Sequence, residues 1–345
     1  MGFSFWKILR PYPVFFGSLD IFFIILYPKN ALFYEIHFMT FAIKWIVQNF
    51  HSFYNGTKKG ESPMKLNREI AILRSLLRLT QTELAKELDV SFETVNRWEN
   101  GKHEAEEENA EKVYAYAFRK GIRLNEIYEQ FFKEEEKEGT RILFHGSKGE
   151  IAFPLDLEHS RKNNDFGPGF YMGESLKQAA AYIANSSSHR VYVFQVRLRS
   201  LRAVSFRVDR EWMLAIAYFR GWIPEYAEKP ILRDIIAKVE RSDIVIAPIA
   251  DNRMFDIISE FVRGEITDAQ CEHALAATNL GMQIVARTEK ALDAIEFVNL
   301  CYLSKPEKEA TLSERLKMHA LSQDKGKAAR IEYRGKGRYI DELFL

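Results

Sequence analysis

His145, Gly146 and Ser147 end a segment that begins at Arg141 and contains the apolar run Ile142 to Phe144, and residues of these three types can bind a ribose. The apolar run is typical of a buried strand, so the three residues are expected at a strand end. A histidine there can donate a hydrogen bond to a ribose hydroxyl, and a glycine leaves the backbone open to a ligand because it has no Cβ. A histidine satisfied within the fold is the alternative interpretation.

Two tyrosines form a second candidate pair. Tyr171 is expected to end a short strand that follows Gly169, and Tyr182 to lie on the next helix, which Ser175 caps. Two tyrosines so placed can sandwich a planar ring. Ordinary core packing is the alternative, but a packed strand rarely contains glycine, so Gly169 favours a ligand nearby.

A glutamine interrupts a third apolar run, Met282 to Ala286. If this strand is buried, the amide of Gln283 needs hydrogen-bond partners. The lining of a ligand pocket would supply them. A glutamine on an edge strand that faces water is the alternative.

The elements that must position these residues occur in blocks of strands and blocks of helices. Strands are expected at 141–147, 170–172, 190–198, 202–208, 243–249, 282–286 and 296–302, and helices at 175–185, 209–221, 230–241, 252–263 and 268–277. Such blocks favour an α+β domain over a doubly wound sheet. Asp165 to Gly169 reads as a glycine turn, and the sequence has neither a Walker loop nor a dinucleotide glycine fingerprint.

A helical domain precedes these elements. Apolar residues share one helical face from Asn67 to Leu77. Thr80 and Ser91 are good N-caps for two further helices, and Thr80 is followed by a glutamate three residues on. The pattern predicts three short helices in succession.

The segment from Gln81 to Lys102 resembles the Cro/C1-type helix-turn-helix family, most of all in its Trp-Glu-Asn-Gly ending. The resemblance implies an all-α domain whose third helix enters the DNA major groove. The residues implied to face DNA are Gln81, Ser91, Phe92, Thr94 and Arg97. Residues 64–138 contain 13 Lys and Arg against 17 Asp and Glu, so their attraction to phosphates should be weak. A dimerisation or partner-docking domain is the alternative.

The C-terminal motifs together resemble the ADP-ribosyltransferase fold. Tyr171 and Tyr182 have the spacing of the tyrosine pair in the poly(ADP-ribose) polymerase-like branch. The His-Gly-Ser motif, the segment from Asp165 to Tyr171 and the Met-Gln-Ile motif also resemble a bacterial domain of that superfamily, DUF3990. The resemblance implies a split antiparallel sheet, NAD as co-substrate and no metal.

The resemblance also implies residue roles, with His145, Tyr171 and Gln283 at the catalytic positions. His145 would hold the nicotinamide ribose, the backbone of Gly146 would bind the carboxamide, and the two tyrosines would stack the ring. The implied NAD-binding residues are His145, Gly146, Ser147, Gly169, Tyr171 and Tyr182.

The third motif departs from the polymerase-like pattern, which ends in glutamate. Gln283 can hold a ribose hydroxyl but cannot act as a base. Transfer of a single ADP-ribosyl group is therefore favoured over chain building, and a polar cluster of Asp251, Asn252 and Asp256, or else Glu289, could supply a base. The implied protein is a bacterial toxin or defence effector with NAD, a protein or nucleic-acid acceptor and an antitoxin as partners. A DNA-binding transcriptional regulator whose C-terminal domain binds NAD without turnover is the alternative.

Composition divides the chain into five parts. Residues 1–63 hold 17 of the 46 aromatic residues. They are followed by the helix-turn-helix domain (64–130), a charged linker (131–139), the α+β domain (140–304) and a helix with a basic tail (305–345). Charges balance, at 49 Lys and Arg against 48 Asp and Glu, which excludes a global basic field. Two cysteines exclude a disulfide framework and favour the reducing cytoplasm.

The aromatic-rich stretch has three interpretations. Its apolar run from Tyr12 to Tyr27 is shorter than the roughly 20 residues that cross a bilayer, and it contains Asp20, so a membrane role is disfavoured. A partner-binding segment is the second interpretation. The third is a mis-assigned start, with Met64 as the first residue, because Lys59 to Glu61 can be encoded by a ribosome-binding sequence.

Overall fold

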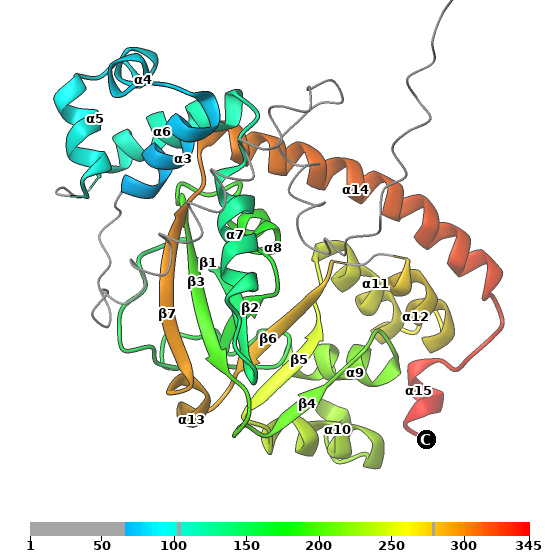
Figure 1. The fold of residues 1–345 in the computed structure, drawn as a ribbon. Coiled ribbons are helices and arrows are strands. Elements are labelled where there is room, and N and C mark those ends of the chain that lie inside the picture. Colours follow the sequence, from blue (N-terminus) through cyan, green and yellow to red (C-terminus); the bar gives the residue numbers. More distant parts are fainter. Residues whose placement is uncertain (1–65, 102–104, 278–279) are drawn as a thin grey trace, which may run out of the picture.

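The computed structural model describes residues 66–101, 105–277 and 280–345 (Figure 1). The aromatic stretch 1–63 and the residue Met64 lie outside these ranges, and so do the interpretations that concern them. Within the described ranges, no helix combines the length and the apolar character needed to cross a membrane. The same ranges hold no group of three or more His, Cys, Asp or Glu side chains placed to bind a metal ion.

In the described part of the chain before the sheet, five helices form the first module, and the caps predicted for two of them are confirmed. Thr80 accepts from the backbone N–H of Glu83, whose side chain returns the bond in a capping box, and Ser91 accepts from the N–H of Thr94. Val95 and Trp98 are buried in the module's core. The helices are α3 (Asn67–Leu77), α4 (Gln81–Leu88), α5 (Phe92–Glu99), α6 (Glu107–Arg119) and α7 (Leu124–Glu134).

A seven-stranded sheet forms the centre of the second part, with the order β4-β5-β6-β2-β1-β3-β7. Neighbouring strands are antiparallel except for β4 and β5, which are parallel. Its two halves join through a single residue pair, Phe144 with Gly173, so the sheet is nearly split between β1 and β2. The strands are β1 (Thr140–Gly146), β2 (Phe170–Gly173), β3 (Arg190–Arg197), β4 (Ala203–Ser205), β5 (Ile244–Pro248), β6 (Met282–Ala286) and β7 (Ile295–Tyr302).

Helices cover one face of the sheet and a long loop covers the other. Apolar side chains of β2, β5 and β6 pack against one helical layer, and those of β1, β3 and β7 pack against α8 and the first module. Ile151, Phe153, Leu155 and Leu157, from the loop between β1 and β2, pack on the opposite face. Ala291 and Leu292 of the short helix α13 also pack on this opposite face. The helices of this part of the chain are α8 (Leu176–Ile183), α9 (Arg210–Phe219), η1 (Pro224–Tyr226), α10 (Pro230–Glu240), α11 (Asn252–Val262), α12 (Asp268–Ala276), α13 (Glu289–Leu292), α14 (Lys305–Glu332) and α15 (Ile340–Leu343).

The expected linker 131–139 begins inside a helix. Phe131 and Phe132 lie in the last turn of α7 and are buried, so only the residues after Glu134 connect the two parts. The many charged residues of this segment predict a linker, but its two phenylalanines pack α7 against the core. That core is continuous from the first module to β1, β7 and α8.

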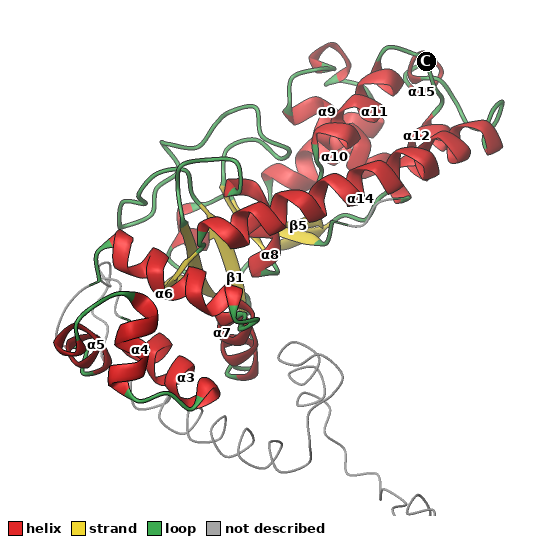
Figure 2. Ribbon diagram, turned by 90° about the horizontal axis from the view of Figure 1, so that it is seen from above, coloured by secondary structure: helices red, strands yellow, loops and turns green. Residues whose placement is uncertain are grey.

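The C-terminal residues also carry more structure than a basic tail. Helix α14 runs from α6 past α8 to α12 (Figure 2). The stretch from Lys325 to Arg338, part of the expected basic tail, lies within α14 as far as Glu332. Beyond it, Ile340, Leu343 and Phe344 are buried against the helical layer, because they supply the apolar face that the basic residues lack.

Candidate functional site

The histidine of the first motif lies where β1 and β2 stop pairing. His145 follows the single pair between the strands, and its Nδ1 lies 2.6 Å from the carbonyl oxygen of Tyr171. Its ring stacks on Phe170 with 4.6 Å between the ring centroids. A carbonyl oxygen only accepts, so Nδ1 carries the proton and donates it to this bond.

The protonation state of His145 determines whether its free ring nitrogen would donate or accept a hydrogen bond with a ligand. Burial lowers the pKa of His145, so the imidazole is neutral at pH 7. With the proton on Nδ1, the Nε2 atom is a hydrogen-bond acceptor. A ribose hydroxyl would therefore donate to His145, which reverses the polarity expected from the sequence.

The glycines of the motifs are required by close packing. A Cβ on Gly146 would lie 2.3 Å from the carbonyl oxygen of Ala179, because α8 crosses β1 there. A Cβ on Gly169 would lie 2.6 Å from a methyl group of Val285. Space for the neighbouring elements therefore accounts for both glycines without a ligand. Ser147 follows the strand, and its hydroxyl accepts a hydrogen bond from the backbone N–H of Gly149 at 3.3 Å.

The hydroxyl of Tyr171 closes the glycine turn that precedes its strand. It donates to the carbonyl of Gly167 at 2.7 Å and accepts from the N–H of Phe166 at 3.1 Å. Its ring packs against the helical layer, and burial raises its pKa. Tyr171 is thus a clamp on the turn as well as a candidate wall of the site.

The second tyrosine has different surroundings. Tyr182 is 54% exposed on α8, and the Lys148 ammonium lies 5.3 Å from its ring centroid. Tyr171 is instead partly buried against the helices. The sandwich expected of the two rings stays a prediction.

The glutamine of the third motif is buried, on a strand flanked by β5 and β2, so the edge-strand alternative is wrong. Gln283 pairs with Gly173 in the ladder between β6 and β2. Its Nε2 donates to Oδ2 of Asp165 and to the carbonyl of Pro248, both at 3.2 Å. The buried amide thus has partners, as expected, and these two are protein groups.

The three motif residues lie on three adjacent strands but on two faces. Side chains alternate along a strand. His145 therefore shares a face with Phe170, while Tyr171 and Gln283 share the helix-covered face. A ligand that contacts both faces must lie where the pairing of β1 and β2 ends.

Two residues of this network were missed at the sequence level. Asp165 is buried, and its Oδ1 accepts from Nη1 of Arg220 at 2.8 Å. The guanidinium of Arg220 lies 3.7 Å from the ring centroid of Phe255. The only signal for Asp165 was its place at the start of the glycine turn, and Arg220 had none, because 55 residues separate the pair.

The acidic residues considered as bases lie at opposite ends of β6. Pro248 pairs with Met282, so Asp251, which follows β5, is at the same end as Gln283. Asp251 is the N-cap of α11, and its side chain accepts a hydrogen bond from the backbone N–H of Met254. Glu289 follows the other end of β6, which places it away from Gln283.

The residues implied to face DNA are only partly free to do so. The amide of Gln81 donates to Glu99 at 2.5 Å and accepts from Asn96, so it is held within the module. The hydroxyls of Ser91 and Thr94 lie 3.1 Å apart, and Ser91 caps the helix. On α5, Phe92 is 45% exposed, and Arg97 is exposed as well.

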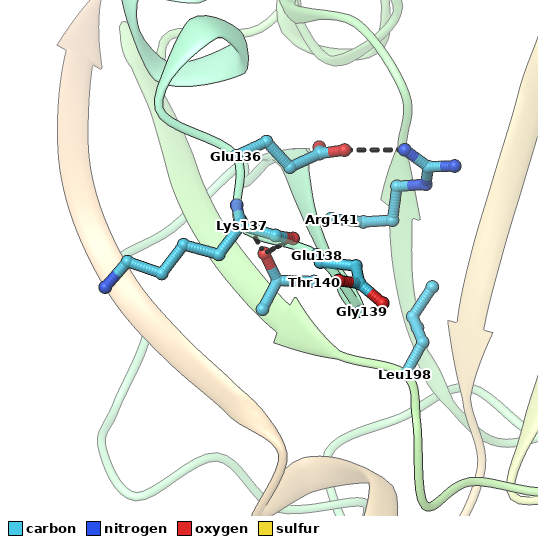
Figure 3. A pocket seen from close by; sticks show the side chains of 7 residues that line it. All are labelled: Glu136, Lys137, Glu138, Gly139, Thr140, Arg141 and Leu198. Carbon is cyan, nitrogen blue, oxygen red and sulfur yellow. Dashed lines mark hydrogen bonds and ion pairs between the residues drawn. The ribbon is translucent and has the colours of Figure 1, made fainter.

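A cavity of about 340 Å³ lies at the other end of β1 (Figure 3). It is lined by Glu136 to Arg141 and by Leu198, and Glu136 forms an ion pair with Arg141 at 2.5 Å. Thr140 and His145 are at opposite ends of the strand, which at 3.3 Å per residue places this cavity roughly 16 Å from the histidine. It is therefore separate from the motif residues.

Comparisons with known families match two separate ranges of the chain. Residues 141–297 match the family described as a protein of unknown function (DUF3990), and residues 70–113 match a helix-turn-helix family. No curated protein and no solved structure gives a significant match. The chain therefore combines a helix-turn-helix module, of a type that suggests DNA binding, with a DUF3990 domain.

Proposed function

We propose that residues 140–304 bind NAD⁺ and transfer its ADP-ribosyl group to a macromolecule, and that the helix-turn-helix module directs this activity. The observation that supports the proposal best is the position of His145. Its side chain bridges β1 and β2 where their pairing ends, and it presents an acceptor nitrogen there. Tyr171 and Gln283 lie on the next two strands.

The chemistry follows from the acceptor character of the site. The bond between the ribose and nicotinamide breaks with its electron pair leaving on nicotinamide, which departs neutral. A lone pair of the acceptor forms the new bond at the same carbon, and the proton of the acceptor passes to solvent. His145 Nε2 and Gln283 Oε1 would each accept a hydrogen bond from a ribose hydroxyl. Because both atoms are neutral acceptors, they would hold the ribose without placing a positive charge beside the cationic transition state.

The same residues favour transfer of one group. The amide of Gln283 is not basic, so it cannot take a proton from a sugar hydroxyl and activate it for chain growth. The acceptor must then be a good nucleophile itself, or receive help from Asp251 at the same end of β6 or from Asp256 on the helix α11 that follows Asp251. A transferase of this kind acts as a toxin or defence effector when unrestrained, and an antitoxin is the partner that would restrain it.

The helix-turn-helix module would supply location rather than tight binding. Ser91, Phe92 and Arg97 are exposed members of the implied DNA surface, and Phe92 and Arg97 lie on α5 itself. The module's net negative charge weakens its attraction to phosphates. DNA near the bound module is then a candidate acceptor.

The test uses the full chain with NAD⁺ labelled in the adenylate phosphate and a cell lysate. We expect label in a macromolecule, and protease or nuclease digestion identifies the acceptor class. His145→Ala should abolish labelling while near-UV circular dichroism is preserved. His159→Ala is the matched control, because this histidine is 85% exposed and contacts Asp156 in a surface loop. Labelling that survives in His145→Ala would refute the proposal.

A second candidate is a DNA-binding regulator that binds NAD⁺ without turnover. The engagement of Gln283 favours it, because both amide hydrogens bond to protein groups. It predicts retained NAD⁺, no release of nicotinamide, and duplex binding that changes when NAD⁺ is added.

A further inference from the structure

We propose that Asp165 and Arg220 are positioning residues that fix the amide of Gln283 and exclude a carboxylate from its position. The part that concerns ligands rests on the proposed function, whereas the part that concerns the side chain at 283 does not. Asp165 lies on the glycine turn, Arg220 at the end of α9 and Gln283 on β6.

The orientation of the amide follows from its two partners. The carbonyl of Pro248 can only accept a hydrogen bond. The carboxylate of Asp165 likewise only accepts when it is ionised, the state that its ion pair with Arg220 favours. Both lie 3.2 Å from Nε2 of Gln283, so the two N–H groups must point at them. The only polar side-chain atom that Gln283 can then offer a ligand is Oε1. A hydroxyl or an N–H fits this atom, and a phosphate or carboxylate does not.

Arg220 holds the carboxylate that orients the amide. Burial raises the pKa of Asp165, and the Arg220 guanidinium at 2.8 Å opposes that shift. The guanidinium is itself held over the ring of Phe255. The chain of contacts therefore runs from an aromatic ring through an ion pair to the amide.

This arrangement explains glutamine at 283. A glutamate would place its oxygens against two acceptors, the carboxylate of Asp165 and the carbonyl of Pro248. It could remain there only when protonated, and then it could satisfy only one of them. Gln283→Glu should thus create a carboxyl group with a raised pKa rather than a base at neutral pH.

The first experiment needs no ligand. The free energy of unfolding in urea is measured between pH 5 and pH 8 for the wild type, Gln283→Glu, Asp165→Asn and the double variant. A carboxyl whose pKa is raised by folding contributes stability at low pH, and that contribution is lost as pH rises through the folded pKa. Gln283→Glu should therefore lose stability toward pH 8 relative to wild type. Asp165→Asn should rescue it, because an asparagine can donate to the introduced carboxylate while its oxygen accepts from Arg220.

The control for added charge is Gln323→Glu, which lies on the exposed side of α14. It should follow the wild type at every pH. If Gln283→Glu is unfolded at pH 8 but folds at pH 5, the inference is supported. If it has the pH profile of the control, or if Asp165→Asn fails to restore it, the inference is wrong.

The second experiment measures affinity for NAD⁺ by calorimetry in wild type and Asp165→Asn. An asparagine can turn its own amide toward Gln283 and release the glutamine's orientation, so we expect about tenfold weaker binding, the loss of one well-placed hydrogen bond. Equal affinity would overturn the positioning role. If the unfolding data agree but wild type does not bind NAD⁺, the proposed function fails while the assignment of Asp165 and Arg220 stands.

Discussion

Tyr171→Phe separates the two roles that Tyr171 can have, because it keeps the ring and removes the hydroxyl. That hydroxyl holds the turn through the N–H of Phe166 and the carbonyl of Gly167. Phe166 is fully buried, so its N–H would lose its partner without access to water. One unsatisfied buried donor costs about 1–3 kcal/mol, and the lost bond to Gly167 adds about 1 kcal/mol. We therefore expect a destabilisation of about 2–4 kcal/mol.

Urea unfolding measures the total loss of stability, and hydrogen exchange of the Phe166 amide shows whether that loss arises at the turn. Tyr182→Phe is the control, because its ring is largely exposed, and it should change stability by less than about 0.5 kcal/mol. If Tyr171→Phe unfolds at the same urea concentration as the wild type and the Phe166 amide stays protected from exchange, the hydroxyl does not stabilise the turn. Binding of NAD⁺ by a folded Tyr171→Phe then reports on the ring alone.

Three further predictions concern other motif residues. Gly146→Ala should destabilise the protein by roughly 1–3 kcal/mol in urea, because its methyl group meets the carbonyl of Ala179; wild-type stability would mean that α8 moves without cost. Partial burial lowers the pKa of His145 and keeps the imidazole neutral, so stability should fall as pH drops below about 6.5, and His145→Gln should reduce this loss in thermal unfolding between pH 5 and 7.5. An equal slope in both proteins would contradict the neutral imidazole. Arg97→Ala should weaken duplex binding and lower its salt dependence by about one phosphate contact; an unchanged salt slope would remove α5 from the DNA surface.

Local signals in the sequence predict the elements well. Thr80, Ser91 and Ser175 each cap the helix expected after them, because a cap depends on residues only three positions apart. The strand at Met282 to Ala286 is confirmed residue for residue. Periodicity and capping act over one or two turns of chain, so the sequence shows them directly.

The polar network of the site could not be predicted in the same way. Asp165 meets Arg220 and Gln283 across 55 and 118 residues, and no local pattern specifies which carboxylate joins which amide. The polarity of His145 has the same origin, since its tautomer depends on the carbonyl of Tyr171, 26 residues away. The sequence shows which residue types the motifs contain, whereas the direction of each hydrogen bond that they form depends on the tertiary structure.

The joint between the two parts bears on how DNA binding could affect the C-terminal domain. Glu111 of α6 accepts from the first N–H of α14 at 3.1 Å, and Asn125 of α7 donates to Tyr302 and to Glu307. Burial raises the pKa of Glu307 to about 7, so this joint is sensitive to pH near neutrality. Because these bonds accompany a shared apolar core, α5 has a fixed direction relative to the strands that carry His145 and Gln283. A duplex bound to α5 would therefore lie at a set distance from the proposed site, which limits the acceptors within its reach.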